Sequence, residues 1–411
     1  MYCKKCESQV AVILRKKDYY CENCFMLSTN HKFRACIGKN KVLSPNENVL
    51  ICLSGGVGSA VLLDLVYHGI SLENNKKLRI VPHFLHLYVI AESVLKQCQK
   101  YNFHVYFVHF SNYLNSNAQL PEANQIVAGD EVEIKEFTKL LKSMPPTAAN
   151  DYLLKVKRNL FVKYAKEIKC SAIFTAETTN TLAINLLCNL AIGRGAQVQN
   201  DVVSTIFKIK IIFSGNNIGL FTLNNCFFSD LQGFCDIRDE NVKILRPMKD
   251  ISKEELDYYV NIKKLNPIIE TNIKLNSIQS TISSFVSELQ DNFQSTISTV
   301  CKTADKIGDY DEDKACNCSC IFLFQSDLYA KDMKLSALEA TNISRTVSLG
   351  NTHLKLDLET NSKLSILQNN VNVSMFPLIN KYLCYGCSRN HSEMKSPSYL
   401  CQVVFTVTNI L

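Results

Sequence analysis

The chain has 411 residues, a formal net charge of +7 and 18 cysteines. This length is enough to bury a substantial core and to form two or three units. No apolar run reaches about 18 residues, so we predict no transmembrane helix. The first residues, Met-Tyr-Cys-Lys-Lys-Cys, lack the apolar core of a signal peptide. We therefore expect a cytoplasmic chain whose cysteines stay reduced or bind metal instead of forming a disulfide framework.

The positive charge is concentrated at the N-terminus. Residues 1–41 contain nine Lys or Arg and three Asp or Glu, so they carry +6 of the total +7. A basic module of this kind suggests contact with a polyanion, for which RNA is the natural candidate. A solvated basic face would give the same composition, and charge alone does not separate the two interpretations.

Four cysteines near the N-terminus have the spacing of a metal site. Cys3 and Cys6 form one C-x₂-C pair, Cys21 and Cys24 form another, and fourteen residues lie between the pairs. Two such pairs can bring four thiolates together on a tetrahedral zinc ion. All four ligands are cysteine, so we predict a structural zinc ribbon. Its two strands are expected at residues 10–14 and 19–20. Redox activity of the thiols is the alternative.

A basic helix is expected next, from Phe25 to Gly38, with Gly38 as its C-cap. We predict RNA contacts for four basic residues of this region and the turn after it: Lys32, Arg34, Lys39 and Lys41. Phe33 lies among them and is predicted to be a core contact rather than a platform for a stacked base.

A glycine-rich loop follows a short apolar run. Val49 to Leu53 has the pattern of a buried parallel strand, and Ala60 to Tyr67 that of a helix with an apolar stripe. The turn between them contains the candidate phosphate-binding residues Ser54, Gly55, Gly56, Gly58 and Ser59. A strand, glycine loop and helix in this order present backbone N–H groups to an anion. The spacing is not that of a Walker loop. An ordinary strand-to-helix turn is the alternative.

Strands and helices alternate from residue 48 to about 250, which predicts an α/β fold with a parallel sheet covered on both faces. Ligands of such sheets bind at the carboxyl ends of the strands, where the 54–59 loop and Ala176-Glu177 fall. Four histidines in apolar strands lack the spacing of metal ligands and are expected in the core or at a sheet edge: His83, His86, His104 and His109.

The expected strands are 79–87, 103–110, 171–176 and 244–249, and the expected helices are 91–101, 131–143, 152–169 and 181–192. Residues 111–150 are expected to be irregular or partly helical, and 199–229 to form a hairpin. Ser252 and Glu255 have the spacing of a capping box. Residues 266–294 are polar and favour a helix with loose flanks.

A second cysteine group lies toward the C-terminus. Cys384 and Cys387 form a C-x₂-C pair that predicts a second metal site. Its other ligands are ambiguous, because Cys316, Cys318 and Cys320 are not cleanly spaced. Free buried thiols are the alternative.

Several motifs occur in an order that resembles the cytoplasmic tRNA 2-thiolation protein 2 family. They are the paired C-x₂-C motifs, His31-Lys-Phe-Arg-Ala35, Gly38-Lys-Asn40, Ser54-Gly-Gly, Asn189-Leu-Ala-Ile-Gly-Arg-Gly195, Leu245-Arg-Pro-Met248, Thr299-Val-Cys301 and Leu383-Cys-Tyr-Gly-Cys387. The resemblance implies a PP-loop fold, similar to the adenine nucleotide alpha-hydrolases. It also implies a catalytic paralogue, cytoplasmic tRNA 2-thiolation protein 1, with an intact S-G-G-x-D-S loop.

The resemblance further implies 2-thiolation of the wobble uridine in lysine, glutamine and glutamate tRNAs. ATP activates the uridine carbonyl by adenylation, and sulfur comes from a thiocarboxylated ubiquitin-related modifier. The domains implied are a zinc ribbon with its basic helix at 1–46, a PP-loop-like domain at 47–265 and a cysteine-containing extension at 266–411. Zinc is the expected cofactor, no membrane is involved, and ATP binding is in question.

This sequence departs from the active pattern in three places. Gly58 replaces the acidic loop residue, Ala176-Glu177-Thr178 replaces a Gly-His-Asn type of turn, and the strand at 81–90 ends without an acidic residue. We therefore assign no catalytic residue and expect a non-catalytic, tRNA-binding partner subunit. One alternative is an active sulfurtransferase that uses Cys301, Cys316, Cys318 or Cys320 for persulfide chemistry. The other is a zinc-stabilised scaffold without RNA contact.

Overall fold

A computed structural model describes residues 2–14, 17–74, 77–88, 92–115, 117–127, 129–193, 235–236, 239, 241–268, 276–293 and 296–304. The contacts divide the chain into two units. The first contains Met1–Phe137, Val156–Ala191 and Gly195–Gly308, and the second contains Thr138–Lys155, Ile192–Arg194 and Asp309–Leu411. The predicted hairpin at 199–229 and Cys316, Cys318, Cys320, Cys384 and Cys387 lie outside the described residues.

The first unit begins with a small hairpin and a long helix. Strands β1 (Val12–Leu14) and β2 (Asp18–Tyr20) pair antiparallel, with Ile13 opposite Tyr19. Helix α1 (Glu22–Asn40) starts directly after them, because the Cys21 sulfur accepts a hydrogen bond from the Cys24 backbone N–H and caps the helix. The predicted C-cap at Gly38 is wrong. The helix continues to Asn40 and ends where Lys41 takes a left-handed conformation, with φ of 46°.

The main sheet has six strands in the order β5-β4-β3-β6-β8-β7. They are β3 (Glu47–Leu53), β4 (Ile80–Tyr88), β5 (Val105–His109), β6 (Ala172–Phe174), β7 (Cys235–Asp236) and β8 (Lys243–Leu245). All neighbours pair in parallel except β7, which is antiparallel to β8 at the edge. The predicted parallel arrangement is therefore confirmed for five strands, and β7 was not predicted.

The remaining helices follow the expected alternation. They are α2 (Val57–Ser71), α3 (Glu92–Gln99), a 3₁₀ turn η1 (Phe110–Tyr113), α4 (Glu131–Lys142), α5 (Pro146–Glu167), α6 (Thr179–Ile192), α8 (Lys253–Lys263), α9 (Ile278–Asn292) and α10 (Thr296–Ala304). Helix α5 begins six residues before the predicted position, with Pro146 at the first helical position, where a missing N–H costs nothing. None of the described helices is long and apolar enough to cross a membrane.

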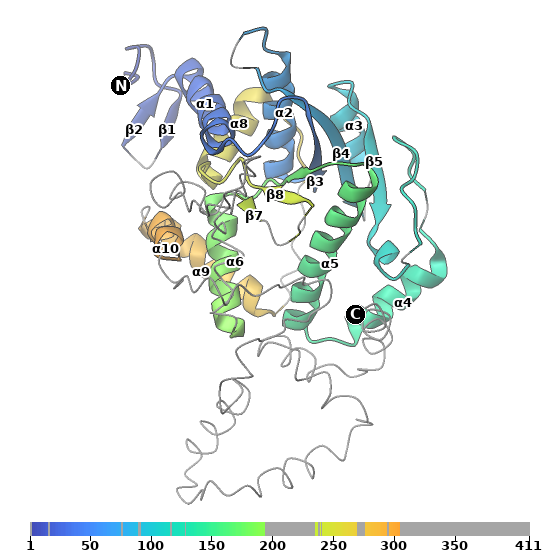
Figure 1. The fold of residues 1–411 in the computed structure, drawn as a ribbon. Coiled ribbons are helices and arrows are strands. Elements are labelled where there is room, and N and C mark those ends of the chain that lie inside the picture. The colour runs from blue at the N-terminus through green and yellow to red at the C-terminus, as the bar shows by residue number, and fades with distance from the viewer. Residues whose placement is uncertain are drawn as a thin grey trace, which may run out of the picture. The chain divides into compact units, whose positions relative to one another are not determined.

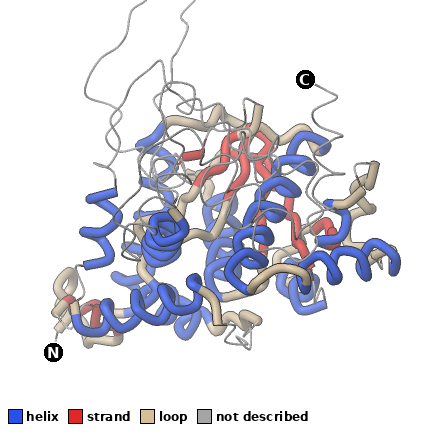
Figure 2. Tube along the Cα trace, turned by 90° about the horizontal axis from the view of Figure 1, so that it is seen from below, coloured by secondary structure: helices blue, strands red, loops and turns tan. Residues whose placement is uncertain are grey.

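The core of the first unit lies on both faces of the sheet. Val49 and Ile51 point to one face, where they pack with buried residues of α1, α2, α3 and α8. Leu50 and Cys52 point to the other face and are also buried. Figure 1 shows α1, α2 and α8 side by side, and in Figure 2 the helices flank the strands. Both faces of the central strand are thus closed to solvent, as its apolar sequence predicts.

A smaller cluster joins α6 to the two helices that follow α8. Ala183 of α6, Val286 of α9 and Ile297 of α10 are buried together, with Val300 and Cys301 packed against them. The predicted helix at 266–294 corresponds to α9. The part of α5 that belongs to the second unit contains an ion pair between Lys155 and Asp151, with 3.0 Å between Nζ and Oδ2.

The predicted capping box at the start of α8 is confirmed. The Ser252 hydroxyl accepts from the Glu255 N–H, and the Glu255 carboxylate accepts from the Ser252 N–H at 2.9 Å. We expect Ser252→Ala to lower the free energy of unfolding by about 1 kcal/mol, measured by urea denaturation. Ser44→Ala, at a turn, is the control and should change it little. Equal effects of the two substitutions would show that the cap does not stabilise α8.

Candidate functional site

The glycine loop lies at the point where the order of the strands reverses. From β3 the chain proceeds to β4 and β5 on one side, and then returns to place β6 on the other side of β3. The carboxyl ends of β3 and β6 therefore flank a topological switch point, which is where open parallel sheets bind ligands. The loop begins at Ser54, directly after β3, and α2 begins at Val57. Of the predicted residues, Ser54, Gly55 and Gly56 form the loop at this position, and Gly58 and Ser59 lie in the first turn of α2.

The backbone of the loop is fixed at Gly55. This residue has φ of +84°, which favours glycine, and a Cβ there would lie 2.5 Å from Ile268 Cδ1 and 3.0 Å from Val94 Cγ2. The Ile268 N–H donates to the Gly55 carbonyl oxygen at 2.9 Å. Gln97 holds the same segment by donating from Nε2 to the Asn266 carbonyl oxygen at 2.8 Å. The segment after α8 is thus tied down over one side of the loop.

The first turn of α2 has no side-chain cap. Gly56 is the N-cap residue and accepts, through its carbonyl oxygen, a bond of 3.0 Å from the Ser59 hydroxyl. Ser54 donates to Ser59 Oγ at 3.4 Å. The uncapped backbone N–H groups retain the arrangement that favours an anion. Ser59, however, is buried and directs its proton to the carbonyl oxygen of its own loop.

No acidic side chain extends from the loop at Gly58. A Cβ at this residue would lie 3.1 Å from the Ala176 carbonyl oxygen and 3.4 Å from Ala176 Cβ. Position 58 therefore packs closely against the end of β6. Any side chain at this position would need Ala176 to shift by a few tenths of an ångström.

Two nearby carboxylates serve structural contacts instead. Glu177, just after β6, forms an ion pair with Arg246 at 2.6 Å between Oε2 and Nε, and the Arg246 side chain is only 6% exposed. Asp64 of α2 is buried and accepts from the hydroxyls of Tyr101 and Tyr259 at 2.8 and 2.6 Å. Burial and the Asp64 carboxylate raise the pKa of Tyr259. Both carboxylates are held by partners away from the loop.

The four histidines make structural contacts, as the sequence predicts. His86 is buried, and its Nδ1 lies 2.8 Å from the Leu53 carbonyl oxygen. His83 contacts Asn48, His104 contacts Asn124, and His109 bonds to Ser111. Burial lowers the pKa of His83 and His109, which favours their neutral forms.

The N-terminal cysteines come together as their spacing predicts. Each of Cys3, Cys6, Cys21 and Cys24 offers one sulfur atom, and all four lie within 4.8 Å of one another. Cys6 Sγ is 3.4 Å from the sulfur atoms of both Cys21 and Cys24. A tetrahedral zinc site with Zn–S bonds of about 2.3 Å would place the sulfur atoms about 3.8 Å apart. The donor set and its dimensions therefore fit a structural metal ion.

Backbone contacts support the same site. The N–H groups of Lys5 and Cys24 lie 3.4 Å from the sulfur atoms of Cys3 and Cys21 and donate to them. The Lys4 N–H donates to the Tyr19 carbonyl oxygen at 2.9 Å, which ties the first cysteine pair to β2. These donors would stabilise thiolates, the form in which cysteine binds metal.

The predicted RNA contacts differ in their surroundings. Lys32 forms an ion pair with Glu255 at 2.6 Å, and the Glu255 side chain is 7% exposed. This pair joins α1 to α8, so Lys32 has a structural role that sequence spacing could not reveal. Arg34, which directly follows Phe33 in the sequence, lines the cavity between α1, α2 and α8. Lys39 lies in the last turn of α1, and Lys41 is exposed just after it.

The N-terminal cysteine module packs against the rest of the first unit. Val12, Leu14, Phe25 and Phe33 share one buried cluster with β3, α2 and α8. Phe33 is 1% exposed, so its predicted place in the core is confirmed.

Cys301 of α10 donates from its thiol to the Thr179 carbonyl oxygen at 3.6 Å, at the start of α6.

Comparison with known proteins identifies similar sequences and a similar fold. A family model described as cytoplasmic tRNA 2-thiolation protein 2 matches residues 277–389. The protein of that name from Drosophila ananassae is 26% identical over 96% of this chain and 92% of its own length. The one from Aedes aegypti is 28% identical over 74% of this chain and 65% of its own length. These findings confirm the resemblance predicted from the sequence.

Among solved structures, this chain is similar to the U34-tRNA thiolase NcsA from Methanococcus maripaludis, solved with its [4Fe-4S] cluster. The TM-score is 0.51 at 17% identity, over 75% of this chain and 88% of that one. At this identity the likeness concerns the fold alone. It supports the predicted α/β architecture with a mostly parallel sheet.

We expect the purified full-length chain to lose one metal ion per chain when Cys24 is replaced by serine, because three thiolates cannot complete the tetrahedral site. The unfolding midpoint should also fall, since the module shares the core of the first unit. Elemental analysis and thermal unfolding measure the two effects, and the element found separates zinc from iron. Cys98→Ala, at a buried cysteine of α3, is the control and should keep the full metal content. Unchanged metal content in Cys24→Ser would exclude the site.

Proposed function

We propose that this chain acts in tRNA thiolation as a non-catalytic subunit, because it is similar along nearly its whole length to a protein named cytoplasmic tRNA 2-thiolation protein 2. In this proposal a catalytic paralogue, cytoplasmic tRNA 2-thiolation protein 1, performs the adenylation in the cytoplasm. The substrates are the wobble uridines of lysine, glutamine and glutamate tRNAs. A thiocarboxylated ubiquitin-related modifier supplies the sulfur.

The observation that carries the non-catalytic role is the loop at the switch point. It keeps the backbone turn and the uncapped start of α2, but Gly58 offers no carboxylate, and a Cβ at this position would lie 3.1 Å from the Ala176 oxygen. Glu177 is neutralised by buried Arg246. Preorganised charge at a reaction centre typically accounts for about a hundredfold or more in rate. A loop without it favours a binding or structural role over catalysis of adenylation.

The basic N-terminal module supports a part in holding tRNA. A metal ion would fix β1, β2 and the start of α1, and α1 would present Arg34, Lys39 and Lys41. Lys32 belongs to this set only in part, because Glu255 compensates its charge. Phosphate contacts by such side chains give affinity that falls with salt and depends little on sequence.

The first test is mass spectrometry of wobble 2-thiouridine in cells that lack this chain. The proposal predicts loss of the modification and full rescue by both the wild-type chain and the Ser54→Ala/Ser59→Ala double variant. Rescue by the wild type alone would mean that the loop still binds a ligand that matters, and the sulfurtransferase alternative would gain. Normal thiolation without the chain would contradict the proposed function.

The second test concerns the tRNA contact. We expect Arg34→Gln to weaken binding of unmodified tRNA and to lower the slope of log affinity against log salt by about 0.7 to 0.9 for the contact removed. Lys32→Gln should weaken tRNA binding and also lower the unfolding midpoint, since it removes the ion-pair partner of buried Glu255. Arg79→Gln, just before β4, is the matched control and should leave both quantities unchanged. If the Arg34 variant equals the control, α1 does not hold tRNA.

A further inference from the structure

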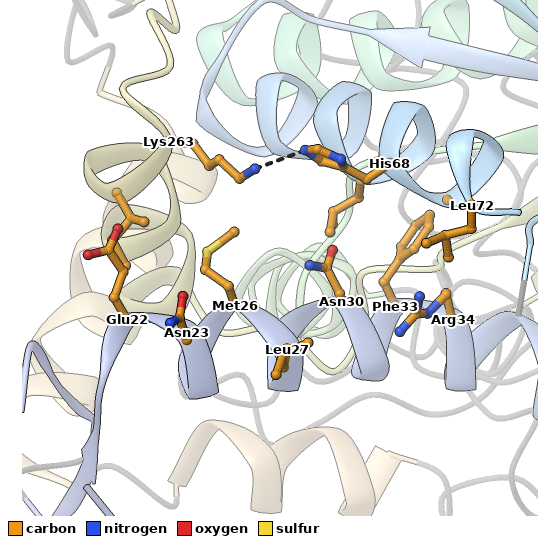
Figure 3. Close-up of a pocket in the computed structure, with 13 residues that line it drawn as sticks. Glu22, Asn23, Met26, Leu27, Asn30, Phe33, Arg34, His68, Leu72 and Lys263 are labelled. Carbon is orange, nitrogen blue, oxygen red and sulfur yellow. Dashed lines mark hydrogen bonds between the residues drawn. The ribbon is translucent and has the colours of Figure 1, made fainter. Parts of the chain in front are cut away.

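A cavity of about 440 Å³ lies between α1, α2 and α8, away from the glycine loop. Figure 3 shows Met26 and Asn30 pointing from α1 toward α2, with Lys263 of α8 and His68 of α2 across from them. Phe33 and Leu65 are each 1% exposed and contribute to its lining. Its size falls in the range of sites for small organic ligands, about 300–1,000 Å³.

One face of α1 supplies most of the lining. Five lining residues follow one another at intervals of three or four, as 23, 26, 30 and 33 and as 30 and 34, and therefore lie on the same side of the helix. They are Asn23, Met26, Asn30, Phe33 and Arg34. Polar and apolar side chains alternate along this face. Leu27 is 66% exposed at the margin, and acidic Glu22 lies at the far end of the face.

The polar groups on the two sides of the cavity differ in whether they have partners within the protein. On α2 and α8, His68 Nε2 and Lys263 Nζ are 2.9 Å apart and lie beside buried Asp64. On α1, the side chains of Asn23, Asn30 and Arg34 have no hydrogen-bond or ion-pair partner in the part of the chain that the structure describes. The cavity thus offers two amides and a guanidinium beside an apolar surface.

We propose that this cavity holds one unstacked nucleotide of the bound RNA, an inference that rests on the proposed function. The apolar surface around Met26 and Phe33 would contact the flat base, the Asn23 and Asn30 amides would bond to its edge, and Arg34 would bind the phosphate. Proteins read single-stranded RNA in this way, by packing splayed-out bases and bonding to their edges.

The same groups argue against a protein helix as the occupant. Apolar side chains inserted into the cavity would cover Met26 and Phe33 but would leave the two amides and the guanidinium of α1 without partners. A desolvated polar group without a partner opposes binding. The charges also favour RNA, because Arg34 and Lys263 line the cavity and residues 1–41, which include α1, carry a net charge of +6.

The test uses the full-length chain and a short, fluorescently labelled single-stranded oligouridylate, with unmodified tRNA as a second probe. We expect Asn30→Leu to weaken binding of both RNAs about tenfold, because the base loses its edge contact. The salt slope should not change, since no charge is removed. Asn261→Leu, at an exposed position of α8, is the matched control and should bind as the wild type does.

A cross-linking experiment on the wild type needs no variant. RNA that contains 4-thiouridine should cross-link, on near-ultraviolet irradiation, to the peptide that includes Met26–Arg34. If Asn30→Leu does not fold, Asn23→Leu at an exposed position replaces it, with the same expected loss.

The outcomes separate this inference from the proposed function. Normal RNA affinity of folded Asn30→Leu, with cross-links outside α1, would overturn the cavity proposal and leave tRNA binding intact. Loss of a protein partner instead of RNA would equally overturn it, because the cavity would then be a protein-docking site. Absence of RNA binding by the wild-type chain would contradict the tRNA-binding role and the cavity proposal together.

Discussion

The left-handed turn at Gly55 is the constraint on which this structure depends. It lets the chain leave the carboxyl end of the central strand and enter α2 while the Ile268 side chain packs where a Cβ would otherwise stand. Through the bond from the Ile268 N–H to the Gly55 carbonyl oxygen, the turn also fixes the segment after α8. The loop therefore connects β3 to α2 and contacts both α3, through Val94, and the segment after α8, through Ile268. This structural role gives the loop a conformation that packing alone can maintain, whether or not the loop binds a ligand.

The N-terminal module and the α/β sheet share one buried core. The cysteine cluster lies at the start of α1, since Cys21 is both a candidate metal ligand and the N-cap of the helix. Phe33 and the ion pair between Lys32 and Glu255 then attach α1 to α8, and the same Glu255 completes the capping box of α8. The candidate metal site, the cap of α1 and the packing of α1 against α8 are thus linked through a few side chains. A rigid α1 in turn presents Arg34 and its neighbours in fixed positions.

The parts that the sequence predicts well are those controlled by local patterns. The cysteine spacing, the apolar run of β3, the glycine loop and the Ser252 capping box each contain their own signal, and the structure bears them out. The C-cap at Gly38 was wrong because Gly38 does not adopt a left-handed conformation, which Lys41 adopts instead with φ of 46°. The two residues of β7 and the partner of Lys32, 223 positions away, depend on long-range pairing that no local pattern encodes. The sequence contains asparagines of α1 at helical spacing, but only the fold shows that α2 and α8 lie opposite them and close a cavity.

The most direct test of the central claim is ATP-dependent release of pyrophosphate by the purified full-length chain, alone and with unmodified tRNA. A loop whose conformation is kept for packing, and whose position 58 has no carboxylate, should release no more pyrophosphate than the Ser59→Ala variant, with or without tRNA. Saturable release by the wild type that tRNA stimulates and Ser59→Ala abolishes would contradict the account, because the switch point would then be an active adenylation site.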